Sequence, residues 1–306
     1  MSSIMTNVSA MTALKSLTAT NNALESTQAR ISTGYRVAEA SDNAAYWSIA
    51  TTMRSDNKAL STVQDALGLG AAKLDTAYTA MTAARDVVDE IKSKIVAAME
   101  PGVDKSKIQS EITQLQEQLT GIAGSASFSG ENWLSVDSGD AAYSATKSIV
   151  SSFNRAADGT VSVSTIDVDT TTTELFDSAD QSGILDTEFT TTGAGAVTVS
   201  VSNLDISAAG LDDTDMSEML SAVDDALASM TTAASDLGAA KSRVSMQKDF
   251  VGNLMDAIDR GVGTLVDADM NEESTRLQAL QVQQQLGIQA LSIANSNSQQ
   301  ILSLFR

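Results

Sequence analysis

The sequence contains neither cysteine nor histidine among its 306 residues, has a single proline, and is only 4% aromatic. Without cysteine there can be no disulfide. Without both residue types there is no cysteine nucleophile, no Ser-His or Cys-His catalytic pair and no zinc site of the usual kind. The missing cysteines leave the compartment open, because an exported protein can dispense with disulfides. We therefore expect a protein that is not an enzyme and that uses no cofactor or metal.

Basic residues are also scarce, with 19 Lys and Arg against 39 Asp and Glu, so the net charge is −20. This balance disfavours a nucleic-acid partner, because binding to phosphates needs a basic patch. No run of about 18 apolar residues occurs, so we expect no membrane span. The first 15 residues lack the basic start and dense apolar core of an ordinary signal peptide. If the chain is exported, we expect it to leave the cell by another route.

The C-terminal stretch from Leu277 to Phe305 has no charged residue, no proline and one glycine, which predicts a helix. On a helical wheel its apolar residues fall on two opposite faces. One face holds Leu277, Leu280, Ile288, Leu291, Ile301, Leu302 and Phe305, and the other holds Val282, Leu286, Ile293 and Leu304. A helix on the surface of a monomer needs only one apolar stripe. We therefore expect this helix to be surrounded by other helices.

The N-terminal stretch has the same character. Lys15, Glu25 and Arg30 are the only charges among residues 1–35. Apolar residues recur at heptad spacing, with two polar interruptions that can fix the register of a helix pair. The expected seam comprises Ala10, Leu14, Leu17, Leu24 and Ile31, interrupted by Asn21 and Gln28. We predict a helix over residues 2–32 that ends at Gly34 and pairs with the C-terminal helix.

Helical patterns continue on both sides of the middle of the chain. We expect a short helix over 44–53, capped by Ser41 or Asp42, and a long helix over 56–99 that ends before Pro101. Its predicted seam comprises Leu60, Val63, Leu67, Leu74, Ala77, Met81, Ala84, Val88, Ile91 and Ile95. Further helices are predicted over 105–123 and 213–267. The second of these has a pattern that includes Met216, Val223, Met230, Leu237, Val244 and Met246. Asn271 is expected to cap the last helix.

Composition changes at about residue 137. Residues 137–215 hold 14 acidic side chains and two basic ones, which supplies −12 of the total charge. Alternating Val, Ile, Ser and Asp predict exposed strands near residues 161–169 and 197–201, and short helices fit residues 141–155. Asp167 and Asp169, and the group Asp267, Asp269 and Asn271, resemble calcium loops but lack the required glycine and final carboxylate. We interpret them as solvated acids and this segment as a solvent-facing insert.

The order of these elements is nearly palindromic. It predicts a mainly α fold, a folded-back coiled-coil rod with both termini at one end and a small β-containing variable insert at the other. The expected parts are an N-terminal helix and connector (1–42), the first half of the rod (43–136), the insert (137–213), the second half of the rod (214–268) and a C-terminal helix (269–306).

Three sequence blocks resemble bacterial flagellins, and the short alphaproteobacterial type in particular. The first is Ala-Arg-Ile-Ser-Thr-Gly-Tyr-Arg-Val at 29–37 with the run 40–50, and the second is 108–114 leading to Phe-Ser-Gly at 128–130 and Leu134. The third comprises Gln283–Gln285, Ala294-Asn295 and Ile-Leu-Ser-Leu-Phe-Arg at 301–306. The resemblance covers roughly residues 1–135 and 215–306 and leaves out the insert.

The resemblance implies a structural subunit that polymerises head-to-tail into the flagellar filament for swimming. The terminal helices would form an inner tube, the long helices a shell around it, and the insert the outer surface. The implied polymerisation core is Leu14, Leu17, Leu24, Ile31, Leu277, Leu280, Leu286, Leu291, Ile293, Ile301, Leu304 and Phe305.

The resemblance also implies partners and a location. The partners are other copies of the chain, paralogous flagellins, the filament cap and hook-junction proteins. An export chaperone would bind the C-terminal helix, and the flagellar type III apparatus would export the chain without a cleaved signal. The resulting location is extracellular, in the flagellum.

Two motifs differ from flagellins that immune receptors detect. Where the plant receptor's ligands carry Lys-Asp-Asp, this chain has Ser41, Asp42 and Asn43. Where the ligands of the animal Toll-like receptor carry an Arg and, four residues later, a Leu, this chain has Glu90 and Lys94. Charge reversal at an interface costs a few kcal/mol, roughly, so we expect poor recognition by both receptors.

Other functions remain open at this point. The main alternative is the hook–filament junction protein, an adaptor with related ends that is incorporated in few copies. Some flagellins carry a metalloprotease insert, but that chemistry requires a His-Glu-x-x-His motif and the sequence has no histidine.

Overall fold

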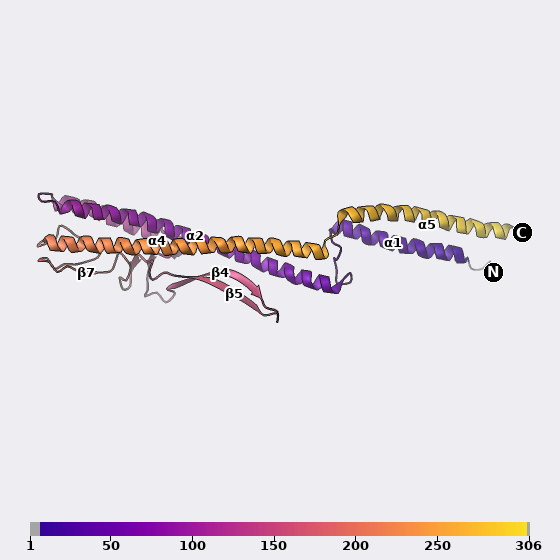
Figure 1. Cartoon of the computed structure of the whole chain (residues 1–306), viewed down its shortest axis with the longest axis horizontal. Coiled ribbons are helices and arrows are strands. Elements are labelled where there is room, and N and C mark those ends of the chain that lie inside the picture. The colour runs from indigo at the N-terminus through magenta and orange to yellow at the C-terminus, as the bar shows by residue number, and fades with distance from the viewer. Residues whose placement is uncertain (1–6, 305–306) are drawn as a thin grey trace. The chain divides into compact units, whose positions relative to one another are not determined.

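The computed structural model describes residues 7–304, and the surroundings of side chains as far as residue 296. This part of the chain is mainly helical, with short strands between α3 (Lys105–Ser125) and α4 (Asp213–Val266) (Figure 1). It divides into two compact units. Unit 1 combines residues up to 58 with residues from 255 onwards, and unit 2 comprises residues 59–254. The expected mainly α fold with long helices and a small strand-containing insert is confirmed.

The first helix, α1 (Val8–Thr33), follows the prediction closely. Its N-cap is Asn7, whose side chain accepts a hydrogen bond from the Ala10 N–H. The helix ends at Gly34, which adopts a left-handed conformation with φ of 79°, and the Gly34 N–H bonds to the Arg30 carbonyl. Glycine adopts this conformation without steric cost, so it stops the helix sharply. The predicted start at residues 2–6 lies outside the described part.

The second helix corrects the prediction of two helices over 44–53 and 56–99. A single helix, α2, runs from Ala44 to Ala98. Neither glycine nor proline occurs between residues 44 and 67 to end a first helix. Its cap is neither Ser41 nor Asp42: Asn43 Oδ1 accepts hydrogen bonds from the N–H groups of residues 45 and 46. Asp42 instead accepts from the N–H groups of residues 38 and 39 and shapes the connector.

In unit 2, α2 and α4 run antiparallel, as ion pairs from Lys92 to Asp224 and from Lys241 to Asp75 show. All ten apolar residues of the predicted α2 seam are buried. On α4 the buried residues follow heptad spacing, with alanine at every second position: Val223, Ala226, Met230, Ala233, Leu237, Ala240 and Val244. Small residues at these positions allow close approach of the helices. Met246 does not belong to this seam, because it is 62% exposed.

The insert consists of short paired strands. The first pair is the antiparallel hairpin of β1 (Ser127–Phe128) and β2 (Glu131–Asn132). The longest pair is the antiparallel hairpin of β4 (Thr146–Arg155) and β5 (Val161–Asp169), so the prediction of short helices over 141–155 was wrong. The remaining pairs are β3 (Ser135–Val136) with β6 (Phe176–Asp177), in parallel, and β7 (Phe189–Thr190) with β8 (Thr198–Val199), antiparallel.

Contacts with all three helices of unit 2 hold the insert in place. Ile149 of β4 packs so closely on Gly70 of α2 that a Cβ at this glycine would lie 2.4 Å from Ile149 Cγ2. The Gln247 side chain of α4 donates to the Ser151 carbonyl at 3.0 Å. From α3, the buried Gln116 donates to two carbonyls of the 201–204 loop. Although its strands alternate as exposed strands do, the insert is therefore part of a packed unit.

Carboxylates at the start of α4 hold the loop that joins β7 to β8. Asp215 accepts the Gly195 N–H at 2.8 Å, and Asp212 accepts the Ala194 N–H at 3.2 Å. A Cβ at Gly193 would lie 2.4 Å from an Asp212 oxygen, so only glycine permits this approach. Asp212 and Asp215, two of the acidic residues where the insert meets α4, thus accept hydrogen bonds from backbone N–H groups.

Asp215 is fully buried, and its environment lowers its pKa from 3.8 to about 2. The Thr191 hydroxyl has the largest effect, and the N–H groups of Gly195 and Asp212 add to it, while burial acts in the opposite direction. Because the pKa in the folded state lies below the ordinary value, the carboxylate stabilises the fold above about pH 4. That contribution is lost as the pH falls through the folded pKa.

Replacing Asp215 with Asn tests this role, because the amide has the same size but no charge. We expect Asp215→Asn to lower the Tm at pH 7 and to make the fall of Tm between pH 4 and pH 2 shallower than in the parent chain. Thermal unfolding followed by circular dichroism across this range measures both effects. Asp213→Asn, at an exposed neighbour, is the matched control; an unchanged Tm at pH 7 for Asp215→Asn would contradict the assignment.

Candidate functional site: the terminal helix pair

In unit 1, α1 and α5 (Met270–Leu304) lie side by side and run in opposite directions (Figure 1). Along their facing sides, residues three and four positions apart are buried or half-buried, which is the spacing of a coiled-coil seam. The seam residues are Ala10, Ala13, Leu17, Thr20, Leu24, Thr27 and Ile31 on α1, and Glu273, Leu277, Leu280, Gln284, Gly287, Leu291 and Ala294 on α5.

Polar contacts fix the register of this pair along its length. They run from the Asn7 amide to the Ala294 carbonyl (2.9 Å), from the Gln284 amide to Asn21 Oδ1 (2.8 Å), and from the Arg30 guanidinium to Glu273 Oε1 (3.3 Å). The helices approach closely at Gly287, where a Cβ would lie 3.2 Å from Leu17 Cδ1. Each contact joins residues from opposite ends of the sequence, so a single arrangement satisfies all of them.

Glu273 is the charged residue of the seam, and its side chain is only 6% exposed. Its Oε1 atom receives Arg30 from α1 at 3.3 Å and Arg276 from α5 at 3.2 Å. A carboxylate buried this far requires such partners, because an uncompensated charge in the interior is costly. The cap of α5 corrects the prediction of Asn271: Asp269 Oδ1 accepts the N–H groups of residues 271 and 272.

The structure describes the side chains of nine of the twelve residues in the predicted polymerisation core, and these nine divide into two groups. Leu17, Leu24, Ile31, Leu277, Leu280 and Leu291 lie in the seam, whereas Leu14, Leu286 and Ile293 are 54%, 57% and 63% exposed. Ile301, Leu304 and Phe305 lie outside the part whose side chains the structure describes. Sequence reasoning placed Leu14, Asn21 and Gln28 in the seam, but these are exposed. Extending the three-and-four spacing from Leu24 would have found Thr20 and Thr27.

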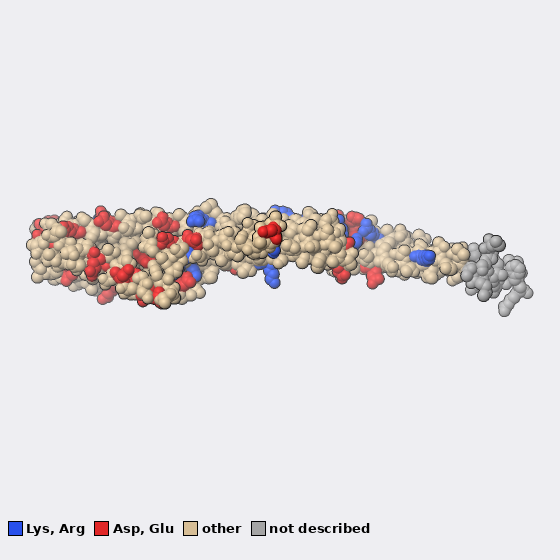
Figure 2. Space-filling model, turned by 90° about the horizontal axis from the view of Figure 1, so that it is seen from below, with Lys and Arg blue, Asp and Glu red and all other residues tan. Residues whose placement is uncertain are grey.

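Both helices carry apolar side chains that the pair does not cover. The exposed set is Val8, Met11, Leu14, Val282, Leu286, Ile288 and Ile293, each more than half exposed. Ile288 was expected to share a face with Leu277 but belongs to this set. Charged side chains are frequent over unit 2 and sparse over the terminal helix pair on the face shown in Figure 2. The outer sides of this pair therefore combine apolar residues with very little charge.

The connector between α1 and α2 ties the base of the pair to the end of α4. The N–H groups of Arg36 and Val37 both donate to the Val266 carbonyl, and the Arg36 guanidinium donates to the Leu265 carbonyl at 3.0 Å. These bonds satisfy carbonyls that a helix end leaves without partners. Val37 joins a small buried cluster with Ala50, Val262 and Val266. The predicted receptor positions Ser41, Asp42 and Asn43 form the last part of this connector, immediately before α2.

The second pair of predicted receptor positions lies on α2 in unit 2. Lys94 Nζ is 2.7 Å from Glu111 of α3 and 3.5 Å from Glu90 of its own helix. Glu111 contributes the larger part to raising the pKa of Lys94. The charges at these positions are therefore already paired within the chain.

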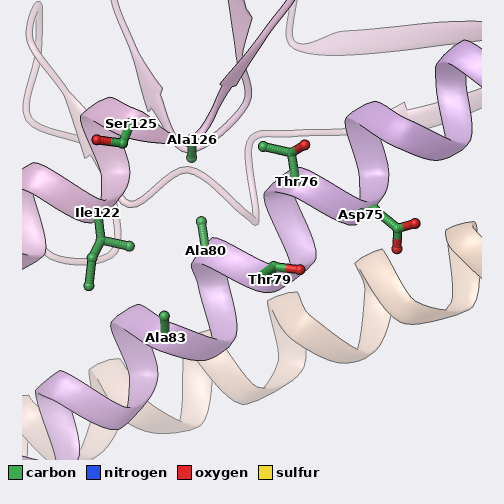
Figure 3. Close-up of a pocket in the computed structure, with 8 residues that line it drawn as sticks. All are labelled: Asp75, Thr76, Thr79, Ala80, Ala83, Ile122, Ser125 and Ala126. Atoms are coloured by element: carbon green, nitrogen blue, oxygen red, sulfur yellow. The ribbon is translucent and has the colours of Figure 1, made fainter.

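A shallow groove of about 510 Å³ lies between α2 and the end of α3 (Figure 3). Small apolar and hydroxyl side chains line it, and its one titratable side chain, Asp75, is paired with Lys241 of α4.

The acids that resembled calcium loops have local structural partners: Asp169 accepts the Thr171 N–H and hydroxyl, and Asp269 caps α5. Within residues 7–304, no group of three or more acidic side chains is arranged to hold a metal ion, and none of the helices has the length and apolar character needed to cross a membrane.

Comparison with known proteins matches both helical regions of the chain. Residues 4–138 match the model of the bacterial flagellin N-terminal helical region, and residues 220–305 match that of the C-terminal helical region. The chain belongs to the bacterial flagellin family. The unmatched stretch between the two models corresponds to most of the insert.

Curated relatives cover the whole of this flagellin and are themselves covered in full. It is 56% identical to flagellin C and 46% identical to flagellin A of Rhizobium meliloti (strain 1021), and 50% identical to the flagellin of Brucella melitensis biotype 1. The alignment with flagellin A spans 396 positions although this chain has only 306 residues, so it contains long gaps. The alignment with the Brucella protein spans 307 positions, so it needs almost no gap in this chain.

These relationships establish the function at the level of the family. The protein is a structural subunit of the bacterial flagellar filament, which extends outside the cell and serves motility. As a flagellin it polymerises with itself and with paralogous flagellins. The alternative of a hook–filament junction protein is not better supported by any relative.

The buried ion pair at the base of the terminal pair generates a prediction. Glu273→Ala leaves Arg30 without its partner, and we expect it to destabilise the pairing of α1 with α5 by roughly 1–2 kcal/mol. This is less than the loss of a fully buried ion pair would cost, because water screens the partly exposed arginines. Hydrogen exchange of the α1 amides measures the loss as faster exchange. Glu272→Ala is the matched control, because it removes an exposed acid whose ion pair within the described residues is with Arg276 and not with α1. Equal exchange in both variants would argue against a stabilising role of the Glu273–Arg30 pair.

Proposed function

We propose that this flagellin polymerises through its terminal helix pair, whose uncovered apolar faces pack against the same helices of neighbouring copies. The observation that carries the proposal is the exposed apolar set on both helices, together with the absence of charge from Leu277 to Phe305. The six core residues in the α1–α5 seam hold the pair together. Leu14, Leu286 and Ile293 provide the contacts between copies, and Ile301, Leu304 and Phe305 add apolar residues further along the sequence.

The energetics favour assembly over a free pair. Complete burial of a Leu, Ile, Val or Met side chain contributes about 1.5–3 kcal/mol, so seven such residues represent a large driving force even after the entropy of association is subtracted. The two outer faces differ from each other in sequence, so a contact between them is heterologous. A heterologous contact that does not close into a ring generates a helical polymer.

The remaining segments take positions around this core. Residues 1–42 and 269–306 form the inner layer, residues 43–136 and 214–268 form a helical shell, and residues 137–213 face the solvent. The charge distribution supports this order, because the insert region supplies −12 of the net charge of −20 and the terminal helices carry very little charge. A filament surface rich in carboxylates stays hydrated and keeps neighbouring filaments apart.

Further partners follow from the same surfaces. We assign an export chaperone to the C-terminal helix, because an apolar helix needs protection before assembly. Export occurs through the flagellar type III apparatus without a cleaved signal, and the filament cap and hook-junction proteins contact the two ends of the polymer. The chain has no enzymatic activity in this scheme.

Two variants test the assembly core. Deletion of residues 277–306 should abolish assembly and swimming and leave a soluble monomer. Leu291→Asp should act nearly as strongly, because it places an uncompensated charge in the seam. Leu291→Met conserves volume and should assemble normally. Sedimentation and negative-stain microscopy of seeded samples are the measurements, and long filaments from the deletion variant would refute the proposal.

The parent chain in the same assay separates filament subunit from junction protein. Long uniform filaments grown from short seeds are expected. Monomers that persist despite good seeds would instead indicate a junction protein, or a minor flagellin that elongates only beside a paralogue. Seeds made from a co-purified paralogous flagellin distinguish these two outcomes.

We further propose that the chain escapes both immune receptors. Lys94 and Glu90 place paired charges, rather than an Arg and a Leu, on the exposed side of α2, and Ser41 removes the lysine of the N-terminal motif. Purified monomer is therefore expected to signal at least tenfold more weakly, roughly, than a recognised flagellin in reporter cells for each receptor. Glu90→Arg combined with Lys94→Leu should raise only the animal response; strong signalling by the parent monomer would contradict the proposal.

A further inference from the structure

The outer side of α1 carries two charged residues, Lys15 and Glu25, and both are exposed. Among residues 7–304 neither side chain has an ion-pair or hydrogen-bond partner. They differ in this from the other charges of the terminal pair: Arg30, Glu273, Glu272 and Arg276 are joined in ion pairs at its base. The terminal pair thus presents one unpaired cation and one unpaired anion.

These two charges lie on the side of α1 that faces away from α5. At 100° per residue, Lys15 falls between the exposed Val8 and Met11, and Glu25 falls between Leu14 and Met11, whereas the α5-facing residues are on the opposite half of the helix. Lys15 and Glu25 therefore belong to the same outer face as the uncovered apolar side chains of α1. Any contact that buries this apolar face also draws the two charges out of water.

A charge removed from water in this way needs a partner, because an unpaired buried ion costs several kcal/mol, roughly. The α5 helix cannot supply one beyond Arg276, because residues 277–305 are uncharged in every copy. The charges at the base are already paired within the chain. In a filament of identical chains, each Lys15 is matched by one Glu25 of opposite charge that also lacks a partner within the described part of its own chain.

We propose that Lys15 of one copy forms an ion pair with Glu25 of a neighbouring copy when their α1 helices pack side by side. The inference rests on the proposed function, in which the terminal helices form the contacts between copies. The partner is a second copy of this chain, selected by one positive and one negative position on an otherwise uncharged apolar face. The pair removes the cost of burying either charge alone and sets the register between copies.

The spacing of the two residues adds a geometric consequence. They are ten positions apart, about 15 Å along a helix axis. For Lys15 of one helix to meet Glu25 of a parallel neighbour, the two copies must be offset along the axis. The Glu25 of the first copy and the Lys15 of the second then remain available for further copies. A contact of this kind repeats without closing, which is the requirement for a helical polymer.

Charge reversal in the full-length chain tests the pair. Lys15→Glu and Glu25→Lys are each expected to raise the critical concentration for assembly at least tenfold, roughly, because each places like charges together. The double reversal K15E/E25K should return it to within about threefold of the parent, since every contact is again complementary. A one-to-one mixture of the two single variants should assemble although neither does so alone. The concentration of unsedimented chain at steady state is the measurement, with the same ammonium sulfate nucleation in every sample.

The double reversal also makes a stronger prediction about seeds. Its copies should elongate fragments of their own filaments and fail to elongate parent fragments, where like charges would meet. Lys107→Glu, which reverses a side chain that is 83% exposed on α3, is the control for net charge and should match the parent.

Two results would overturn the inference. Normal assembly of both single variants would mean that the charges are not paired between copies. A double reversal as defective as the single variants would mean that the partners are other groups, such as Arg306 or the terminal carboxylate. Both results are distinct from a failure of the proposed function itself, which would appear as normal filaments from the chain without residues 277–306.

Discussion

Helices that carry little charge and have apolar side chains on more than one face can bury those side chains only by packing against other helices, and both terminal helices of this chain are of this kind. α1 covers one side of α5 through a seam of leucines, threonines and small residues, and no further helix of the described structure covers the opposite sides. Val8, Met11, Leu286 and Ile293 consequently remain exposed. In a monomer these exposed apolar side chains favour aggregation. In a flagellin their burial between copies contributes favourable free energy to assembly.

Because α1 and α5 carry few polar residues in their contact, those few residues determine the register of the helix pair. Glu273 can be buried because two arginines meet one of its oxygens, and Gln284 and Asn21 bond to each other at the side of the seam. Each contact is worth little beside the apolar burial, but an apolar seam alone permits several registers. The polar groups select one of them, because any shift would leave a buried group without its partner.

In unit 2, a different set of interactions attaches the acidic insert to the long helices. It comprises close approach at Gly70, amide side chains from α3 and α4, and carboxylates at the start of α4 that accept backbone N–H groups. These are local devices, and they leave the helical core of Leu67, Met81 and Leu237 unchanged. In this chain the stretch between the two matched helical regions, residues 139–219, contains most of the insert.

Heptad spacing, Gly34 and Pro101 were enough to predict the long helices and the buried seam of α2, because the period of apolar residues reflects the helix itself. The family could be predicted as well, since its motifs lie in those helices. Sequence reasoning was wrong on three points: it predicted two helices where α2 is one, it placed Leu14 in the α1 seam, and it predicted short helices over 141–155, where β4 lies. The second and third depend on partners distant in the chain: Leu14 and Leu17 are equally apolar, yet only Leu17 meets Gly287. Tertiary structure decided these points, because burial is a property of a pair of surfaces and not of a residue.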